Sequence, residues 1–135
     1  MVLIPDNARD LFERPVVCAL ATIMPDAQPQ VNPVWCDYDG QYVRINTARG
    51  RQKDRNMTNR AKVTVMLVDP KDDGHWVEVR GHVVEITEDG AVEHISALAR
   101  KYEGRDFKVP QGQVRVTYKI EPDRVRAEGN QGNPS

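Results

Sequence analysis

The sequence predicts a mainly β protein, a six-stranded antiparallel barrel with few helices. Short segments in which apolar and polar residues alternate recur along the chain, as half-buried strands require. Tight-turn signals separate most of these segments, and the long crossover connections that parallel strands need are few. Hairpin-linked strands that curl around one core form small barrels, which is the architecture we expect.

The first half of the chain supplies three of the expected strands. Residues 16–23, VVCALATI, are apolar on both alternating faces, which is typical of a strand buried on two sides. Residues 30–37 follow, and Pro33 places this strand at a sheet edge or a bulge, because proline cannot donate to a ladder. An Asp-Gly pair then indicates a hairpin that leads into the third strand, residues 41–47.

The second half supplies strands at residues 61–68, 76–87 and 113–121. The middle one contains Gly81, which indicates a bulge or the close approach of another backbone. Strands that are apolar on both faces, such as 61–68, bury more than one barrel interior, so we expect a homodimer. The last strand alternates most regularly, with an expected inward face of Val114, Val116, Tyr118 and Ile120.

Three helices complete the expected fold. They cover residues 6–13, residues 51–60 and a segment from 89 to 104, where a glycine ends the helix. We expect residues 1–127 to form a single barrel domain. Residues 128–135 are rich in Gly, Asn and Pro, which predicts a flexible tail.

Composition argues against several classes of protein. Lys and Arg number 19 against 20 Asp and Glu, so bulk attraction to nucleic acid or membrane is not expected. No run approaches the ~18 apolar residues of a membrane helix. The first ten residues lack the pattern of a signal peptide, so we expect a cytoplasmic protein. The two cysteines and three histidines lack metal-ligand spacing, so we expect reduced thiols and no metal site.

Familiar catalytic motifs do not occur in the sequence. It contains no Gly-x-Ser-x-Gly, Walker loop, Gly-x-Gly-x-x-Gly or His-Glu-x-x-His pattern. An acid–base pair of carboxylates stays open, but no spacing singles one out. The sequence therefore identifies no catalytic residue.

Residues 47–56, TARGRQKDRN, concentrate positive charge at Arg49, Arg51, Lys53 and Arg55. If a strand ends at Thr47 and a helix begins near Gly50, unpaired backbone amides and the helix dipole favour a bound anion there. A solvated basic face that pairs with nearby carboxylates is an equally good interpretation of the residues alone.

Two tryptophans are the other conspicuous feature, because only 6% of the chain is aromatic. Trp35, beside the proline-broken strand, can wall a pocket for a flat ring. Core packing or a subunit contact is the commoner role of a tryptophan, and is favoured for both Trp35 and Trp76 on the residues alone.

Several segments, in their order and spacing, resemble the split β-barrel flavoproteins related to pyridoxamine 5′-phosphate oxidase. The resemblance covers residues 5–121. Within this superfamily, the Pro-Val-Trp and Gly-Arg-x-Lys-x-Arg-Asn patterns are most similar to the branch that uses the deazaflavin coenzyme F420. The segments that carry the resemblance are Pro33-Val34-Trp35, the basic stretch 47–56, AKVTVMLVDP at 61–70 and WVEVRG at 76–81.

The resemblance implies a homodimer with two cofactor sites at the subunit interface. The residues that it implies for the cofactor phosphate are Thr47, Arg51, Gln52 and Lys53, while Gly50 would let the backbone turn tightly and come close to the ligand. Those implied for the cofactor ring are Val31, Pro33, Val34 and Trp35. Arg49 and Arg55 are the residues implied for the acidic polyglutamate tail of F420. Trp76 and Glu78 are expected to reach the site from a neighbouring strand, in the same subunit or across the dimer.

The activity implied by the resemblance is an F420-dependent reductase, which passes a hydride from the reduced deazaflavin to an unsaturated small molecule such as an enone or a quinone. Two alternatives stay open: an FMN-binding oxidoreductase of the same fold, and a non-catalytic carrier of deazaflavin or flavin. The FMN oxidases carry Arg-x-x-x-x-Lys on the second strand, and residues 30–35 lack these cations, which weakens the FMN alternative. Nucleic-acid binding is not expected, because the basic stretch lacks interleaved aromatic residues.

Overall fold

One curled antiparallel sheet of seven strands dominates the computed structural model of the chain, which describes residues 1–129. The strand order is β2-β1-β5-β6-β7-β4-β3, and all neighbours are antiparallel. The strands are β1 Cys18–Ile23, β2 Pro29–Val34, β3 Cys36–Tyr38, β4 Val43–Ala48, β5 Lys62–Asp69, β6 Asp72–Thr87 and β7 Arg115–Glu128. The helices are the 3-10 turn η1 Asp6–Ala8, α1 Arg9–Glu13, α2 Gln52–Asn59 and α3 Ala91–Glu103.

The mainly β prediction is confirmed, but the prediction of six strands is wrong. The expected strand 30–37 is two strands, β2 and β3, separated by Trp35. β2 pairs only with β1 and β3 pairs only with β4, so these two strands form the two edges of the sheet. Because one residue joins them, the sheet must curl until its edges meet, which gives a split barrel.

Two strands extend beyond their expected ends. The segment between the expected strands 61–68 and 76–87 is mostly ladder, because β6 begins at Asp72, which pairs with Asp69. β7 continues past the predicted end at residue 121, because Pro122 lies opposite a bulge where the missing N–H is tolerated. The first residue of the expected tail, Glu128, therefore belongs to the barrel, while residues 130–135 of that tail lie outside the described residues.

The inward face of β7 follows the expected alternation, apart from Val114. Val116, Tyr118 and Ile120 are fully buried, as predicted. The prediction for Val114 is wrong: this residue is 45% exposed, because it precedes the strand. The other buried side chains that meet them in the barrel core include Leu20, Ile45, Val63, Val65, Leu67, Val77 and Val79.

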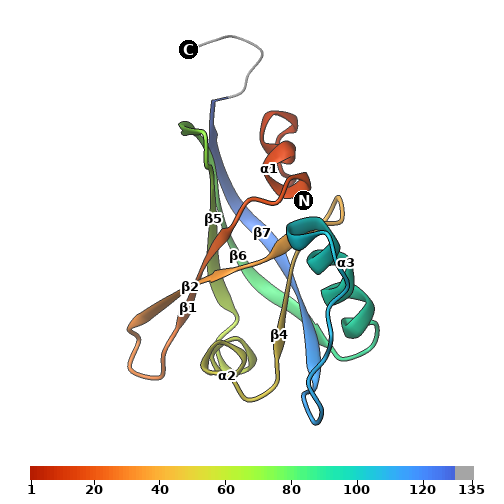
Figure 1. Ribbon diagram of the computed structural model, residues 1–135. Coiled ribbons are helices and arrows are strands. Elements are labelled where there is room, and N and C mark those ends of the chain that lie inside the picture. The colour runs from red at the N-terminus through yellow and green to blue at the C-terminus, as the bar shows by residue number, and fades with distance from the viewer. Residues whose placement is uncertain (130–135) are drawn as a thin grey trace.

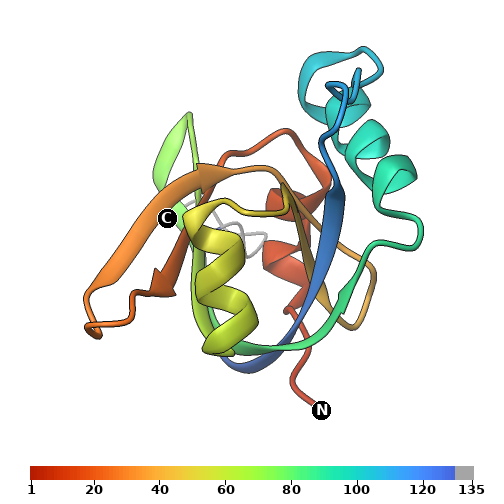
Figure 2. The same ribbon diagram turned by 90° about the horizontal axis from the view of Figure 1, so that it is seen from below.

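The helices close the barrel rather than extend it. α1 and α2 lie at opposite ends of the barrel, and α3 runs alongside β4 and β7 (Figure 1). Figure 2, seen from below, shows α2 lying across the lower end. No helix in the described part of the chain combines the length and apolar character that crossing a membrane requires. Both cysteines are buried and free, as expected.

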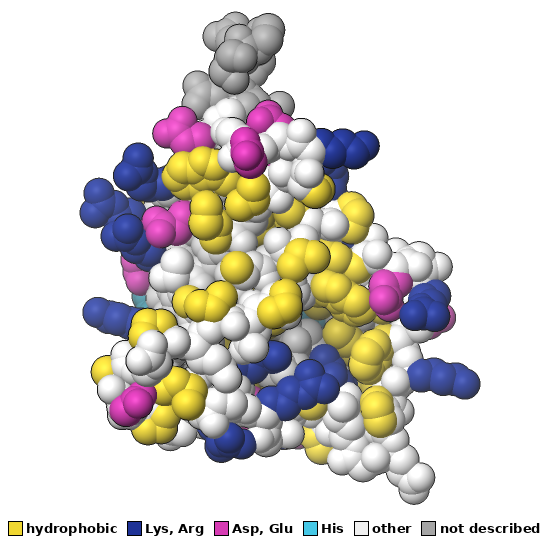
Figure 3. Space-filling view, turned by 60° about the vertical axis from the view of Figure 1, so that its left-hand side comes forward, with side chains coloured by type: hydrophobic (Ala, Val, Ile, Leu, Met, Phe, Trp, Pro, Cys, Tyr) yellow, Lys and Arg dark blue, Asp and Glu magenta, His cyan; other side chains and the backbone are white. Residues whose placement is uncertain are grey.

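The outer face of β1 and β5 is apolar and exposed in the single chain. Val17, Val31, Met66 and Val68 are between 37% and 63% exposed. They share a groove of about 360 Å³ with Ala19, Asn32 and Pro33. Figure 3 shows one face of the molecule with hydrophobic side chains gathered above a group of Lys and Arg side chains. An apolar surface of this kind is characteristic of an interaction site.

Gly81 lies where β6 and β7 come too close for a side chain. The register of the two strands shifts between Arg80 and Gly81, so the predicted bulge is confirmed. A Cβ at this position would overlap the backbone oxygen of Glu121 and approach Ile120 Cγ2 to 2.9 Å. The position therefore requires glycine for its lack of a side chain, because its φ is not positive.

Replacing this glycine by alanine tests the close approach. Gly81→Ala should lower the free energy of unfolding by about 1–3 kcal/mol, because backbone atoms must move to admit the methyl group. Urea unfolding followed by fluorescence measures this. Gly74→Ala is the matched control, since its Cβ would meet only a side-chain oxygen of Asp72, at 3.3 Å. Equal stability of the two variants would contradict the packing argument.

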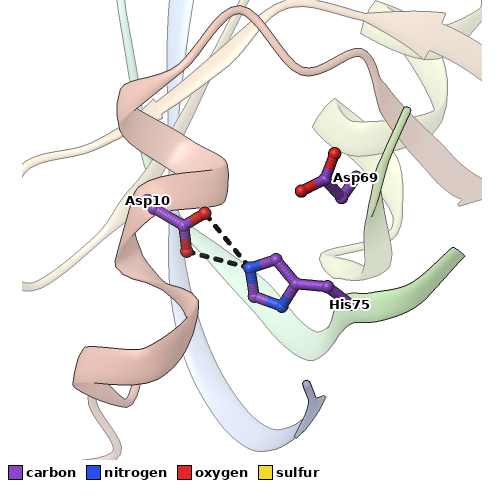
Figure 4. Close-up of side chains that lie close together, drawn as sticks. All are labelled: Asp10, Asp69 and His75. Carbon is purple, nitrogen blue, oxygen red and sulfur yellow. Dashed lines mark hydrogen bonds and ion pairs between the residues drawn. The ribbon is translucent and has the colours of Figure 1, made fainter. Parts of the chain in front are cut away.

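A buried histidine joins the N-terminal helix to the barrel (Figure 4). His75 Nε2 lies 3.0 and 3.1 Å from the two carboxylate oxygens of Asp10, and Nδ1 lies 2.9 Å from the backbone oxygen of Glu128. Both partners are acceptors, so only the doubly protonated ring donates to both. Burial lowers the pKa of His75, but the Glu128 carbonyl and the Asp10 carboxylate outweigh burial and raise that pKa above its ordinary 6.5.

An arginine completes this network and balances its charge. Arg14 Nη2 lies 3.2 Å from Asp10 and 2.8 Å from Asp69, so two carboxylates face two cations. Asp69 lies at the end of β5, and His75 lies near the start of β6. The four side chains therefore hold α1 over this end of the barrel.

The stability of the protein should depend on pH through His75. Its pKa is higher in the folded than in the unfolded chain, so its stabilisation is complete below about 6.5 and is lost as pH rises through the raised pKa. We expect the free energy of unfolding to fall over this window in the wild type and to fall less in His75→Gln. His82→Gln, on the outer face, is the control. Identical pH slopes in wild type and His75→Gln would exclude this contribution.

Candidate functional site

The basic turn is built as the sequence predicts, from a strand end, a glycine and a helix start. β4 ends at Ala48 and α2 begins at Gln52, with Gly50 between them at a φ of +93°. The buried carboxylate of Asp54 fixes the turn from inside. It accepts hydrogen bonds from the Gly50 N–H at 2.8 Å, from Arg49 Nη1 at 3.3 Å and from the hydroxyl of Tyr118.

A cavity of about 390 Å³ opens beside this turn. Strands β2 and β4, helices α2 and α3, and the segment leading into β7 all contribute to its wall. One part of the wall is apolar and another carries cations, so its chemistry suits a flat ring with an anionic substituent. The lining residues are Val17, Pro33, Val34, Trp35, Asn46, Arg51, Lys53, Ile95, Phe107 and Arg115.

None of the three cations in the wall forms an ion pair with a described carboxylate. The pKa of Lys53 is lowered mainly by burial and, to a smaller extent, by repulsion from Arg51 and Arg115. Burial, followed by repulsion from Arg51, lowers the pKa of Arg115 to about 10. The cations repel one another, so an anion in the cavity would relieve that repulsion.

Five of the sequence-predicted residues meet in this cavity. Pro33, Val34 and Trp35 line its apolar part, and Arg51 and Lys53 line its basic part. The indole of Trp35 also stacks on the Tyr102 ring, with centroids 5.3 Å apart and an angle of 13° between the planes. Trp35 therefore fits both interpretations offered by the sequence: it packs against Tyr102 on α3, and it forms part of the cavity wall.

Five predicted residues near the turn do not line the cavity: Thr47, Arg49, Gly50, Gln52 and Arg55. Thr47 points into the barrel, because side chains alternate along β4 and its neighbour Asn46 takes the cavity side. Thr47 is fully buried, and its hydroxyl has no partner among the described residues. Arg49 pairs with Glu88 at 3.1 Å as well as with the buried carboxylate of the turn. Arg55 folds back onto the Gly50 backbone oxygen and onto Gln52, at 2.6 Å from its Oε1.

The remaining predicted residues lie on the outer face of the sheet. Val31 belongs to the apolar groove there. Trp76 is opposite Val68, and Glu78 is opposite Met66, in the ladder between β5 and β6. Within one chain these side chains contribute nothing to the cavity wall.

Sequence reasoning missed five lining residues, which come from five separate segments of the chain. Arg115 begins β7, and pairing with β4 places it opposite Ala48, beside the basic turn. Because side chains alternate along a strand and Val116 faces the core, the sequence indicated only that Arg115 faces away from the core. The strand pairing that determines its neighbours joins residues far apart in the sequence. The other missed residues are Val17, Asn46, Ile95 and Phe107.

A buried polar network supports the cavity wall from behind. His94 on α3 places Nε2 3.2 Å from a carboxylate oxygen of Asp37 and Nδ1 3.0 Å from the Thr117 hydroxyl. Because a carboxylate only accepts, Nε2 carries the proton. Burial raises the pKa of Asp37, but bonds from His94 and Arg44 outweigh it and hold the pKa below its usual range.

Among residues 1–129, two groups of potential metal ligands lie outside the cavity, and in each group the ligand atoms are within 4.8 Å of one another. Sequence spacing did not reveal them, because different elements supply their members. In one group, Arg14 and the protonated His75 already face the carboxylates. The groups are Asp10, Asp69 and His75, and His82, Glu121 and Asp123.

Solved structures similar to this chain include an F420 reductase, which is 31% identical and has a TM-score of 0.82, with 91% of this chain and 98% of that chain covered. Two others are more distant in sequence and show the fold alone. The conserved hypothetical protein Rv2991 from Mycobacterium tuberculosis is 22% identical, with a TM-score of 0.77 and coverage of 100% and 91%. HupZ from Group A Streptococcus is 22% identical, with a TM-score of 0.71 and coverage of 96% and 99%.

A search of curated proteins found no match. The family model described as pyridoxamine 5′-phosphate oxidase matches residues 4–129. That match spans almost the whole barrel, including the basic turn and every residue of the cavity wall. The chain therefore belongs to the pyridoxamine 5′-phosphate oxidase family.

Proposed function

We propose that this protein is an F420-dependent oxidoreductase that reduces an unsaturated small molecule, such as an enone or a quinone. The observation that carries the proposal is the cavity, in which an apolar wall meets cations that lack carboxylate partners. The likeness to an F420 reductase over 91% of the chain supports it further.

The residues present fit the chemistry of F420, a flat deazaflavin ring that carries a phosphodiester and an acidic tail. Arg51 and Lys53 would hold the phosphodiester, beside the free amides at the start of α2. Pro33, Val34 and Trp35 would support the ring. When bound and reduced, F420 supplies the hydride, while the protein binds and orients the two reactants.

An FMN-binding oxidoreductase and a flavin or deazaflavin carrier are the alternative functions. The cavity also suits the ring and phosphate of FMN, so the cofactor must be decided by binding. The carrier alternative stands because no wall residue is assigned as a proton donor.

Titration with the two cofactors tests the proposal directly. Trp35 lines the cavity, so a bound ring should quench its fluorescence. We expect F420 to bind more tightly than FMN, and the protein loaded with reduced F420 to reduce an enone or a quinone while the cofactor is oxidised. Tight FMN binding without a response to F420 would overturn the proposal. F420 binding without hydride transfer to any acceptor would favour the carrier.

Lys53 provides a test of the phosphate position. Lys53→Met should weaken F420 binding by about ten- to a hundredfold, the cost of one charge-assisted contact of about 1.5–3 kcal/mol. Lys62→Met is the matched control, because Lys62 is exposed and does not line this cavity. Equal affinities of the two variants would place the phosphate elsewhere.

We also propose that a second copy of the chain covers the outer apolar groove of β1 and β5, so that two cofactor sites form at the interface. Pro33 and Val17 line both this groove and the cavity, so a partner on the groove would border the site. Trp76 and Glu78 lie beside the groove, where they could face the partner's cavity. This arrangement accounts for predicted site residues that do not reach the cavity of their own chain.

A charged residue in the groove should prevent this assembly. Met66→Asp places a carboxylate on the apolar face, and we expect a monomer where the wild type sediments as a dimer. Val92→Asp, at an exposed valine on α3 outside the groove, should remain dimeric. Sedimentation velocity distinguishes the two outcomes, and a dimeric Met66→Asp protein would exclude the groove as the interface.

A further inference from the structure

Arg115 is the most deeply buried cation of the cavity wall. It is 6% exposed, and no described carboxylate pairs with it. Buried charges in proteins are ordinarily paired, because an unpaired charge loses its hydration without compensation. A guanidinium in this setting needs an explanation beyond the stability of the fold.

Neutral groups hold this guanidinium in a fixed orientation. Its Nε donates to Asn46 Oδ1 at 3.0 Å, and its Nη1 donates to Gln113 Oε1 at 2.9 Å. The ring of Phe107 covers one face, with its centroid 5.0 Å from Cζ. These contacts fix the geometry without neutralising the charge. These two bonds use Nε and Nη1, so Nη2 makes no hydrogen bond to a described residue, and the side chain lines the cavity.

Asn46 is itself held so that its oxygen must face the arginine. Its Nδ2 donates to the backbone oxygen of Ala91 at 2.8 Å and lies 3.4 Å from the Thr117 hydroxyl. The amide oxygen is thereby left for Arg115. Strand β4 and helix α3 thus both contribute to the orientation of the guanidinium, as a preorganised binding group requires.

We infer that Arg115, positioned by Asn46, Gln113 and Phe107, forms a second anion subsite at the β7 side of the cavity. Its free guanidinium edge binds an anionic oxygen of a phosphate or carboxylate group in the bound molecule. The subsite complements the basic turn, which supplies Arg51 and Lys53 from another element. The inference rests on the proposed function only in taking the cavity to be a ligand site. The acid group belongs either to the cofactor or to the substrate.

Inorganic phosphate tests the subsite independently of any cofactor. Phosphate should raise the melting temperature of the Lys53→Met protein, and adding Arg115→Gln should abolish the remaining rise. Arg105→Gln is the matched control, because Arg105 is 75% exposed and pairs with Glu103. A phosphate response that survives in the Lys53→Met, Arg115→Gln double variant would overturn the inference, whether or not the wild type binds F420.

Binding and kinetic measurements together show whether the phosphate or carboxylate bound by Arg115 belongs to the cofactor or to the substrate. If the cofactor carries it, Arg115→Gln should weaken F420 binding about tenfold or more in the fluorescence titration. If the substrate carries it, F420 affinity should stay within about twofold, while KM rises about tenfold for an acidic acceptor and not for its neutral ester. Unchanged values in both assays would overturn the inference.

A conservative variant separates recognition from folding. Arg115→Lys keeps the charge but loses the planar fork, so we expect intermediate affinity for the acid group and an intermediate response to phosphate. Thermal unfolding without ligand verifies that each variant is folded. If Arg115→Lys and Arg115→Gln respond to phosphate alike and as the wild type does, the guanidinium does not bind the anion.

Discussion

The structure depends on one constraint of chain connectivity at Trp35. The two edge strands of the sheet, β2 and β3, are consecutive in the sequence and joined by this single residue. The sheet must curl until its edges meet there, and the chain changes its partner strand from β1 to β4 at the same point. Trp35 is thereby placed between the barrel and α3, where its indole stacks on Tyr102 and also lines the cavity. Barrel closure and cavity formation are consequences of the same connection.

Buried polar groups then give the cavity its charge. Asp54 satisfies the turn and Arg49 from within the barrel, so that carboxylate is not available to the cations of the wall. Asn46 and Gln113 bind Arg115 as neutral acceptors, which orients the guanidinium without compensating it. The wall keeps uncompensated positive charge in a partly desolvated space, where an anion would be bound most strongly. Such an arrangement is costly to folding and is typical of binding sites.

The two ends of the barrel are built differently. At one end, four charged side chains with balanced charges hold α1 in place through His75. At the other, the basic turn and α2 leave positive charge unbalanced beside a cavity. The contrast separates a structural network, which is satisfied internally, from a candidate binding site, which is completed only by a ligand.

The sequence by itself determined most of the strands and the glycine turn, because these depend on local alternation and turn chemistry. Five residues of the cavity wall were predicted through the resemblance to a known family. It did not determine that residues 30–37 divide into two strands, since the division arises from pairing with distant partners. Alternation showed that Arg115 faces outward, but only the pairing of β4 with β7 brought it to the basic turn. Thr47 shares the buried face of β4 with Val43 and Ile45, and it was assigned to the phosphate through the resemblance and not through strand alternation. Tertiary structure alone decided which charges share the cavity, because that depends on contacts between segments far apart in the chain.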